Sequence, residues 1–328
     1  MSTQVLNFSG AYDIGINYGF NGDNLPSPAA VVDLLRASQI SYVRLFEPRK
    51  DVLDSFRGKP FVISLGTRNE DIKNLASSPG AALAWIESNV SPFVNDVNIG
   101  YITIGNEVIP GAEALYIAQA IDNMLAAISA AGITRTIKVS TVVSMNVLGS
   151  SYPPSNGAFS SPTALAMKGI VPLLVRQGAP LMLNVYPYFT YASDPQHISL
   201  EFALFQSKVP AVRDGNLEYY NLFDAMVDAV FVALEKINAP GLSIAIGETG
   251  WPSAGNPPHT TTDNARTYNK NFMDHVLNRT GTPRRPGMAM EAFFFELFNE
   301  DEKAGGVEQN FGFFYPNTRP VYPFWPGS

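Results

Sequence analysis

The chain contains no cysteine, and this absence excludes several kinds of chemistry. Without thiols the protein has no disulfide, no thiolate nucleophile and no cysteine-ligated zinc. There are only three histidines, His197, His259 and His275, and their spacing does not match that of metal ligands. The sequence also lacks apolar runs of about 18 residues, so we expect no membrane-spanning helix.

Several signatures of common protein classes are missing as well. The sequence has neither the GxGxxG spacing of dinucleotide-binding folds nor the GxxxxGK[ST] of P-loops. Ser64, Ser140 and Ser144 lie outside any G-x-S-x-G setting, which argues against a serine hydrolase. The first residues, MSTQVLNFSG, lack the apolar core of a signal peptide.

Positive charge is scarce. The sequence has 22 lysine and arginine residues against 29 aspartate and glutamate residues, which gives a formal net charge of −7. Nucleic-acid-binding proteins present basic patches, whereas the basic stretches here, residues 47–50 and 279–287, read as loops. We therefore expect no nucleic-acid partner. With 328 residues, 46% hydrophobic and 16% charged, the chain is long and apolar enough for a large packed core.

Eight apolar, strand-like runs recur along the chain and mostly alternate with helix-like stretches. This alternation is typical of parallel strands joined by helices. Capping signals mark the helical stretches, since Ser27 and Pro28 can open one helix, and Gly58 and Gly132 can close two others. The expected strands are residues 14–19, 42–47, 61–66, 101–108, 137–143, 180–188, 242–249 and 289–299.

The number of strands and the chain length predict a single (β/α)8 TIM barrel, a fold of about 250 residues or more. A doubly wound sheet is the structural alternative. The first expected strand, however, leads into GINYGFNG (15–22), which lacks the glycine spacing of that fold. No Pro/Gly-rich linker divides the chain. We therefore assign residues 13–328 to one barrel domain and residues 1–12 to an N-terminal extension.

Two of the expected strands end at glutamates. YITIGNEV places Glu107 at the end of one strand, and LSIAIGETGWPS places Glu248 at the end of another. A single glutamate at a strand end is usually a solvated cap or an ion-pair partner. The carboxyl ends of barrel strands, however, converge on one face, where catalytic groups lie. Two such carboxylates indicate an acid/base pair that faces one cleft.

Other polar and aromatic side chains follow the same strand ends. This mixture suits a neutral, polyhydroxylated ligand, because aromatic faces pack on sugar rings and carboxylates or amides bond to hydroxyls. The alternative for each is a structural role, as core aromatic residues or as a solvated loop ion pair. The candidates are Asn17, Tyr18, Arg44, Glu47, Asn106, Tyr186, Tyr188, Phe189, Trp251, Phe298, Asn299, Glu300 and Lys303.

Glycoside hydrolysis needs two carboxyl groups that flank one bond. One is a protonated acid, and the other is a nucleophile about 5–5.5 Å away or a base that holds water at about 6.5–9.5 Å. Glu107 and Glu248 are the natural pair in this sequence. Burial and mutual repulsion should favour one shared proton. Arg44, with donors such as Asn106 or Tyr188, would keep the nucleophile ionised.

Several longer motifs resemble plant endo-β-1,3-glucanases of glycoside hydrolase family 17. They are GNEV (105–108), NVYPYF (184–189), ETGWPS (248–253), NARTYN (264–269), FNEDEK (298–303) and NFGFFYPN (310–317). The similarity keeps its order over nearly the whole chain. It implies a (β/α)8 catalytic domain that hydrolyses β-1,3-glucan with retention of configuration and needs no metal or organic cofactor. The expected partner is a β-glucan polysaccharide or oligosaccharide, bound by a monomer.

The resemblance also implies roles for individual residues. By motif, Glu107 is the proton donor and Glu248 the nucleophile, while Asn106 would hold the sugar 2-hydroxyl or the nucleophile. The other positions carried over are charged residues beside the cleft and aromatic residues of sugar subsites, namely Glu300, Lys303, Glu308, Tyr188, Phe189 and Phe313.

Two positions depart from the family pattern. RLFEP (44–48) replaces the usual tyrosine and short polar residue, so the resemblance does not define the contacts of Phe46 and Glu47. Glu296 stands where the family usually has a small or apolar residue. A carboxylate between barrel and helices would need a partner, and the sequence names none.

Three further points stay open at this level. The same motifs suit a β-1,3-1,4-glucanase or a transglycosylase, and a silent glucan-binding protein is the alternative from another class. The resemblance implies a secreted, cell-wall or vacuolar location. Asn7 (NFS) and Asn278 (NRT) fit the glycosylation pattern.

Overall fold

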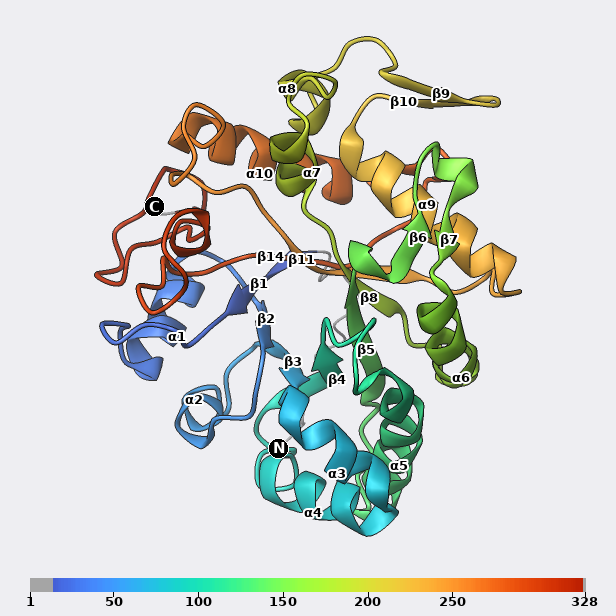
Figure 1. The fold of residues 1–328 in the computed structure, drawn as a ribbon. Helices are drawn as coiled ribbons and strands as arrows, with labels where there is room; N and C mark the ends of the chain where they lie inside the picture. Colours follow the sequence, from blue (N-terminus) through green and yellow to red (C-terminus); the bar gives the residue numbers. More distant parts are fainter. Residues whose placement is uncertain (1–13, 327–328) are drawn as a thin grey trace.

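A closed barrel of eight parallel strands forms the centre of the computed structural model, which describes residues 14–326. Neighbours around the barrel follow chain order, and the last strand closes against the first (Figure 1). The predicted (β/α)8 barrel is confirmed. The expected N-terminal extension and Asn7 lie outside the described residues. The barrel strands are β1 (Ile14–Tyr18), β2 (Tyr42–Leu45), β3 (Val62–Gly66), β4 (Asn98–Asn106), β5 (Lys138–Ser144), β8 (Leu181–Asn184), β11 (Ile244–Thr249) and β14 (Ala292–Phe294).

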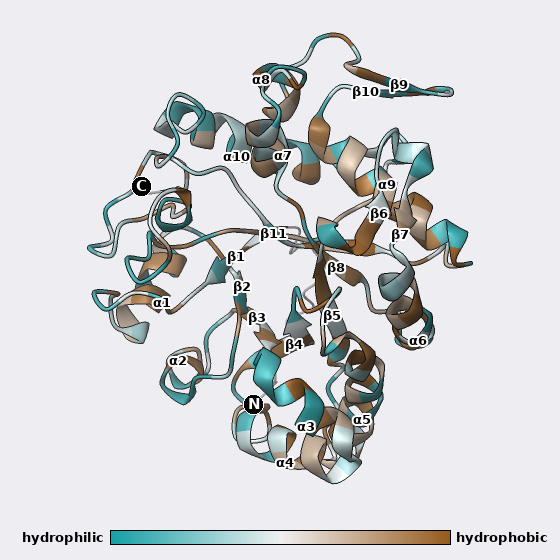
Figure 2. Ribbon diagram, viewed as in Figure 1, coloured by the Kyte–Doolittle hydropathy of each residue, from teal (hydrophilic) through white to brown (hydrophobic). Residues whose placement is uncertain are grey.

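The strands are apolar because both of their faces are covered. One face packs against the surrounding helices, and the other points into the barrel. Figure 2 shows hydrophobic colour along strands such as β8 and both hydrophobic and hydrophilic colour on the outer helices. Within the barrel, one small cluster draws a residue from each of six strands: Tyr42, Tyr101, Val142, Met182, Ala245 and Phe293.

Ten α-helices lie among the described residues, mostly between the barrel strands. The predicted caps are confirmed at Ser27, whose Oγ accepts from the Ala30 amide, and at Gly58 and Gly132, which have positive φ angles of 63° and 68°. The helices are α1 (Pro28–Ala37), α2 (Lys50–Ser55), α3 (Ile72–Ser77), α4 (Pro79–Asn89), α5 (Ile117–Ala130), α6 (Ser161–Gln177), α7 (Pro187–Ser193), α8 (Leu200–Ala203), α9 (Leu222–Lys236) and α10 (Thr262–Leu277).

The last barrel strand is shorter than the sequence predicted. The apolar run was expected to continue to residue 299, but β14 ends at Phe294. Beyond it the backbone pairs with a segment that returns from later in the chain, through the amide of Phe313 to the carbonyl of Glu296 at 3.0 Å and the amide of Phe314 to that of Leu297 at 2.9 Å. The chain thereby turns across the barrel mouth instead of extending the strand.

Among residues 14–326, three small hairpins lie outside the barrel, and none of them was expected from the sequence. They are formed by β6 (Leu148–Ser150) with β7 (Ala158–Phe159), β9 (Val212–Asp214) with β10 (Leu217–Tyr219), and β12 (Gly281–Thr282) with β13 (Arg285–Pro286). Their strands are two or three residues long, too short for a pattern to show. Between residues 14 and 326, no helix has both the length and the apolar character that a membrane crossing requires.

Candidate active site

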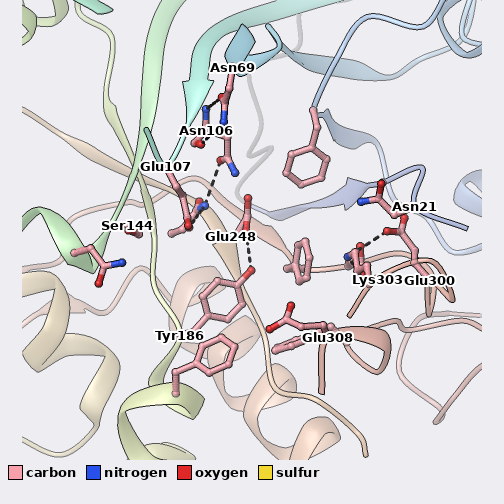
Figure 3. A pocket seen from close by; sticks show the side chains of 18 of the residues that line it. Asn21, Asn69, Asn106, Glu107, Ser144, Tyr186, Glu248, Glu300, Lys303 and Glu308 are labelled. Atoms are coloured by element: carbon pink, nitrogen blue, oxygen red, sulfur yellow. Dashed lines mark hydrogen bonds and ion pairs between the residues drawn. The ribbon is translucent and has the colours of Figure 1, made fainter. Parts of the chain in front are cut away.

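A cleft of about 940 Å³ lies at the carboxyl ends of the barrel strands. Residues at or just beyond the carboxyl ends of all eight barrel strands contribute to its wall, including Gly19, Phe46, Asn69, Asn106 and Ser144 from the first five. Its volume is near the upper end of the range of about 300–1,000 Å³ for ligand pockets. Figure 3 shows side chains from these strand ends around one open space. The cleft therefore crosses the barrel mouth where the sequence placed the catalytic groups.

Glu107 is held at the end of β4 by its backbone. It adopts a left-handed φ of 57°, which is uncommon for a residue other than glycine. Its amide donates to the carbonyl of Val142 on β5 at 2.9 Å. Asn69 clamps the preceding residue, since its side chain accepts from the Asn106 amide at 2.8 Å and donates to the Asn106 carbonyl at 3.1 Å. These hydrogen bonds hold the strained backbone in place, as happens at many functional sites.

The Glu107 carboxyl faces the cleft in a setting that favours its protonated form. Solvent reaches the side chain through the open cleft, but the protein walls remove part of its hydration. This desolvation, together with the negative charge of Glu248, raises the pKa of Glu107. A hydrogen bond of 2.7 Å from the amide of Asn184 acts in the opposite direction and is the weaker influence. Glu107 is thus suited to hold a proton and to release it.

Glu248, at the end of β11, has the opposite environment. Its side chain is 7% exposed, and the Arg44 guanidinium donates to its Oε1 at 2.9 Å. The Tyr186 hydroxyl donates to its other oxygen at 2.8 Å. A cation and a directed hydrogen bond both stabilise the charged carboxylate. The predicted pairing of Arg44 is therefore confirmed, whereas the hydroxyl donor is Tyr186 and not Tyr188.

Amide side chains connect the two carboxyl groups. Arg44 donates to Asn106 Oδ1 at 2.8 Å, and Asn184 donates to the same oxygen at 3.3 Å and to Glu107 at 2.7 Å. Asn106 therefore contacts Arg44 and Asn184 and has no hydrogen bond to Glu248 among the described contacts. The resulting chain of contacts fixes Glu107 relative to Glu248 across strands β2, β4, β8 and β11.

A second group of charges lies on the opposite wall of the cleft. Lys303 pairs with Glu296 at 2.5 Å and with Glu300 at 3.2 Å, and its ammonium lies 4.2 Å from the centre of the Phe295 ring. These residues and Glu308 line the cleft. Glu300 and Lys303 are therefore not the solvated loop pair that was the structural alternative. The partner of Glu296 that the sequence did not name is Lys303.

The structure corrects part of the aromatic set. Tyr186 and Phe189 line the cleft, and Phe189 is 42% exposed. Tyr188 and Phe313 are only 2% and 1% exposed and lie outside the cleft wall. The prediction that these two side chains contact sugar subsites is wrong, because each packs into an aromatic cluster behind the wall. The other aromatic side chains of the cleft wall are Phe20, Phe46, Phe295 and Phe311, of which Phe20 and Phe46 are partly exposed and Phe295 and Phe311 are buried.

Three other predicted residues support the wall from behind. Tyr18 and Phe298 are buried and pack edge to face on each other. Trp251 has no exposed surface and packs on Tyr188. Glu47, left undefined by its sequence context, lines the cleft and pairs with Arg68 at 2.5 Å.

Sequence reasoning gave no role to two amides that matter here, Asn69 and Asn184. Asn184 is the last residue of β8, so the rule that singled out Glu107 and Glu248 could have found it. Asn69 lies in a short 3₁₀ helix after β3 (η1, Asn69–Asp71), and no sequence pattern indicates its contact with Asn106. Among residues 14–326, no group of three or more acidic or histidine side chains is placed to hold a metal ion.

A (β/α)8 barrel with two carboxyl groups in a polar and aromatic cleft belongs to the class of barrel glycoside hydrolases. Comparison with known proteins identifies the family. The model of glycosyl hydrolases family 17 matches residues 14–324. The chain belongs to this family.

Relatives of known name agree with this assignment. The chain is 43% identical to a probable glucan endo-1,3-beta-glucosidase of Arabidopsis thaliana over 317 residues, which covers 95% of this chain and 90% of the relative. It is 40% identical to the basic vacuolar isoform of Nicotiana tabacum, with coverage of 97% and 86%. Among solved structures, a β-1,3-glucanase and allergen of Cryptomeria japonica pollen is 43% identical, with a TM-score of 0.90 and coverage of 95% and 98%.

Proposed function

We propose that the protein is an endo-acting hydrolase of β-1,3-glucan that retains the anomeric configuration. Glu248 is the nucleophile and Glu107 the acid/base. The observation that carries this assignment is the difference between the two carboxyl environments. Arg44 and Tyr186 stabilise a charged Glu248, whereas desolvation and the charge of Glu248 raise the pKa of Glu107.

The reaction then proceeds in two steps. Glu248 attacks the anomeric carbon while Glu107 donates its proton to the leaving oxygen, and a covalent glycosyl-enzyme forms. Glu107, now ionised, removes a proton from water, and the water displaces Glu248. As the proton leaves Glu107, the Asn184 amide stabilises the developing charge. This mechanism requires a separation of about 5–5.5 Å between the two carboxyl groups, which stays a prediction.

The substrate assignment is supported by the relatives and by the cleft. Two of the similar proteins carry glucan endo-1,3-beta-glucosidase in their names. The cleft crosses the whole barrel mouth and has exposed aromatic faces at Phe20, Phe46 and Phe189, which suits several sugar rings of one chain. The Asn106 side chain lines the cleft and contacts Arg44 and Asn184, each of which binds one of the two carboxyl groups, and a sugar 2-hydroxyl would bind beside it. Glu308 and Lys303 would contact neighbouring units.

The first test uses Glu248→Gln and Glu107→Gln with laminarin as substrate. Each variant is expected to lose turnover by orders of magnitude, because each lacks one of the two reacting groups, while it keeps the folded barrel, as far-ultraviolet circular dichroism will show. Products from laminarin and from mixed-linkage glucan, resolved by size, separate a β-1,3 from a β-1,3-1,4 preference and reveal transglycosylation. Near-normal turnover in either variant contradicts the assignment.

The second test assigns the two roles. Alanine variants of both residues are given azide and an activated aryl β-laminaribioside, whose leaving group needs no protonation. Glu107→Ala should form a β-glycosyl azide, because azide displaces Glu248 from the enzyme intermediate. Glu248→Ala should form an α-glycosyl azide by direct attack from the face that Glu248 vacates. If Glu107→Ala formed the α-azide and Glu248→Ala the β-azide, Glu107 would be the nucleophile and Glu248 the acid/base.

We also infer a vacuolar or secreted location and a monomeric state. The support for the location is that a similar tobacco protein is named as a vacuolar isoform. Asn278 is exposed at the end of α10, as a glycosylation site must be.

A further inference from the structure

Glu296 and Glu300 place two buried carboxyl groups on a single ammonium. Their side chains are 0% and 1% exposed, and that of Lys303 is 13% exposed. Lys303 lies nearer to Glu296, at 2.5 Å, than to Glu300, at 3.2 Å. All three side chains line the cleft, and Figure 3 shows Glu300 and Lys303 across it from Glu107.

The charges of this group do not balance if both carboxyl groups are ionised. One ammonium would then face two carboxylates, which leaves one negative charge buried without a cation. The hydrogen bonds do not balance either. Oε2 of Glu296 is buried and accepts no hydrogen bond from the described residues, and Oε2 of Glu300 is buried and meets the Lys303 ammonium at 3.2 Å without a well-formed hydrogen bond. A single proton corrects both defects, because it removes the extra charge and turns one carboxyl oxygen into a donor.

We propose that Glu296 is a positioning residue that shares one proton with Glu300 and so anchors Lys303 in the cleft wall without adding net charge beside Glu248. The two carboxyl groups lie within hydrogen-bonding reach of each other. In the shared state one of them is neutral and donates to the other, and both still accept from Lys303. Lys303 is thereby held at a fixed place against the Phe295 ring.

The surroundings of Glu296 favour the shared proton. The groups that face it are Lys303 and Glu300 of its own segment, Glu248 at the end of β11, and Tyr186, which follows β8. Burial and the negative charges of Glu300 and Glu248 raise the pKa of Glu296 well above its ordinary value, against the effect of Lys303. Burial likewise raises the pKa of Glu300.

The consequence for catalysis rests on the proposed function. If Glu248 is the nucleophile, a second full negative charge next to it would oppose its ionised state. The shared proton avoids this, because the two carboxyl groups then carry a single negative charge that Lys303 balances, and both still accept from Lys303. Lys303 can then donate to a sugar hydroxyl from a fixed position, which lowers the KM for glucan.

The direct test counts protons in the free enzyme and does not depend on activity. Carbon-13 NMR of enzyme labelled at glutamate Cδ follows the two signals that Glu296→Gln and Glu300→Gln remove. We expect both signals to report the same two titration steps, the upper one well above the ordinary glutamate value, as coupled carboxyl groups do. Two independent steps near the ordinary glutamate value of about 4.3 would overturn the proposal.

The kinetic test compares a neutral isostere with a truncation. In Glu296→Gln the amide still accepts from Lys303 and donates to Glu300, so it mimics the proposed neutral acid. Glu296→Ala should raise the KM for laminarin about tenfold through loss of the anchor of Lys303, and Glu296→Gln should recover most of that loss. Glu302→Gln, which removes an exposed carboxylate from the same loop, is the matched control.

Three results would contradict the inference. An unchanged KM in Glu296→Ala would show that Glu296 does not position Lys303. Equal damage in the alanine and glutamine variants would show that Glu296 acts as a charged carboxylate. An effect of Glu302→Gln of similar size would show that the loop responds to charge in general. Absence of laminarin hydrolysis by the wild type would contradict the proposed function alone, because the NMR titration would still decide the shared proton.

Discussion

Replacement of Asn184 by alanine tests one step of the proposed mechanism, the proton transfer from Glu107 to the leaving oxygen. Asn184 donates to the Glu107 carboxyl at 2.7 Å. A hydrogen bond to a charged group contributes about 1.5–3 kcal/mol, and about 1.4 kcal/mol corresponds to tenfold in rate. Because Glu107 is charged only after the proton leaves, most of this contribution belongs to the transition state. Water in the open cleft replaces part of it, so we expect kcat for laminarin to fall about tenfold.

The same change has a predicted sign in the pH profile. The Asn184 hydrogen bond favours the ionised form and so lowers the pKa of Glu107. Its loss raises that pKa, so Glu107 keeps its proton to a higher pH. The alkaline limb of kcat/KM, which reports loss of the acid form, should move upward by up to about one pH unit.

An aryl laminaribioside with a good leaving group provides the control, because its first step needs no proton. Asn184→Ala should lose much less activity in the burst phase of this substrate than with laminarin. An equal loss with both substrates would refute the reasoning, since Asn184 would then act on Glu248 or on binding. An unchanged pH profile together with unchanged kcat would refute it as well.

Two further predictions concern buried charges. Arg44→Met leaves the Glu248 carboxylate buried without its cation, so we expect the free energy of unfolding in urea to fall by about 3–5 kcal/mol. Arg44→Lys keeps a positive charge and should lose less. A loss below about 1 kcal/mol in Arg44→Met would contradict a stabilising role of this ion pair. Burial raises the pKa of Asp228 to about 6, against about 3.9 in the unfolded chain. The folded state thus binds the Asp228 proton more tightly than the unfolded chain does. This proton contributes about 3 kcal/mol to the free energy of unfolding below pH 4, and the contribution is lost as the pH rises through 6. The difference in unfolding free energy between wild type and Asp228→Asn should change by that amount between pH 4 and pH 7, and parallel curves would contradict it.

The barrel and its two glutamates could be predicted because they depend on local patterns. Strands buried on both faces read as apolar runs, and Glu107 and Glu248 interrupt such runs at their carboxyl ends. Parallel strands in a barrel then bring these ends together, whatever their distance along the chain.

The lining of the cleft could not be predicted in the same way. After β14 ends at Phe294, the chain follows no strand periodicity, so neighbouring aromatic residues point in unrelated directions. Phe295 faces the cleft, whereas Phe298 and Phe313 are buried behind it. The contact of Asn69 with Asn106 joins the loop after one strand to the end of another, and only the folded backbone brings them together.

Asn17 connects the active site to the strands that close the barrel. It lies on the first strand, and its amide donates to the carbonyls of Gly247 and Phe294, each at 3.0 Å, while its oxygen accepts from Arg44 at 2.7 Å. The first and last barrel strands, β1 and β14, are thus joined through Asn17, the residue that orients Arg44. We therefore expect that, during refolding, Arg44 reaches its final place beside Glu248 only after β14 has closed against β1. Recovered enzyme activity therefore reports the closing of the barrel, and chains that have formed only the earlier strands stay inactive.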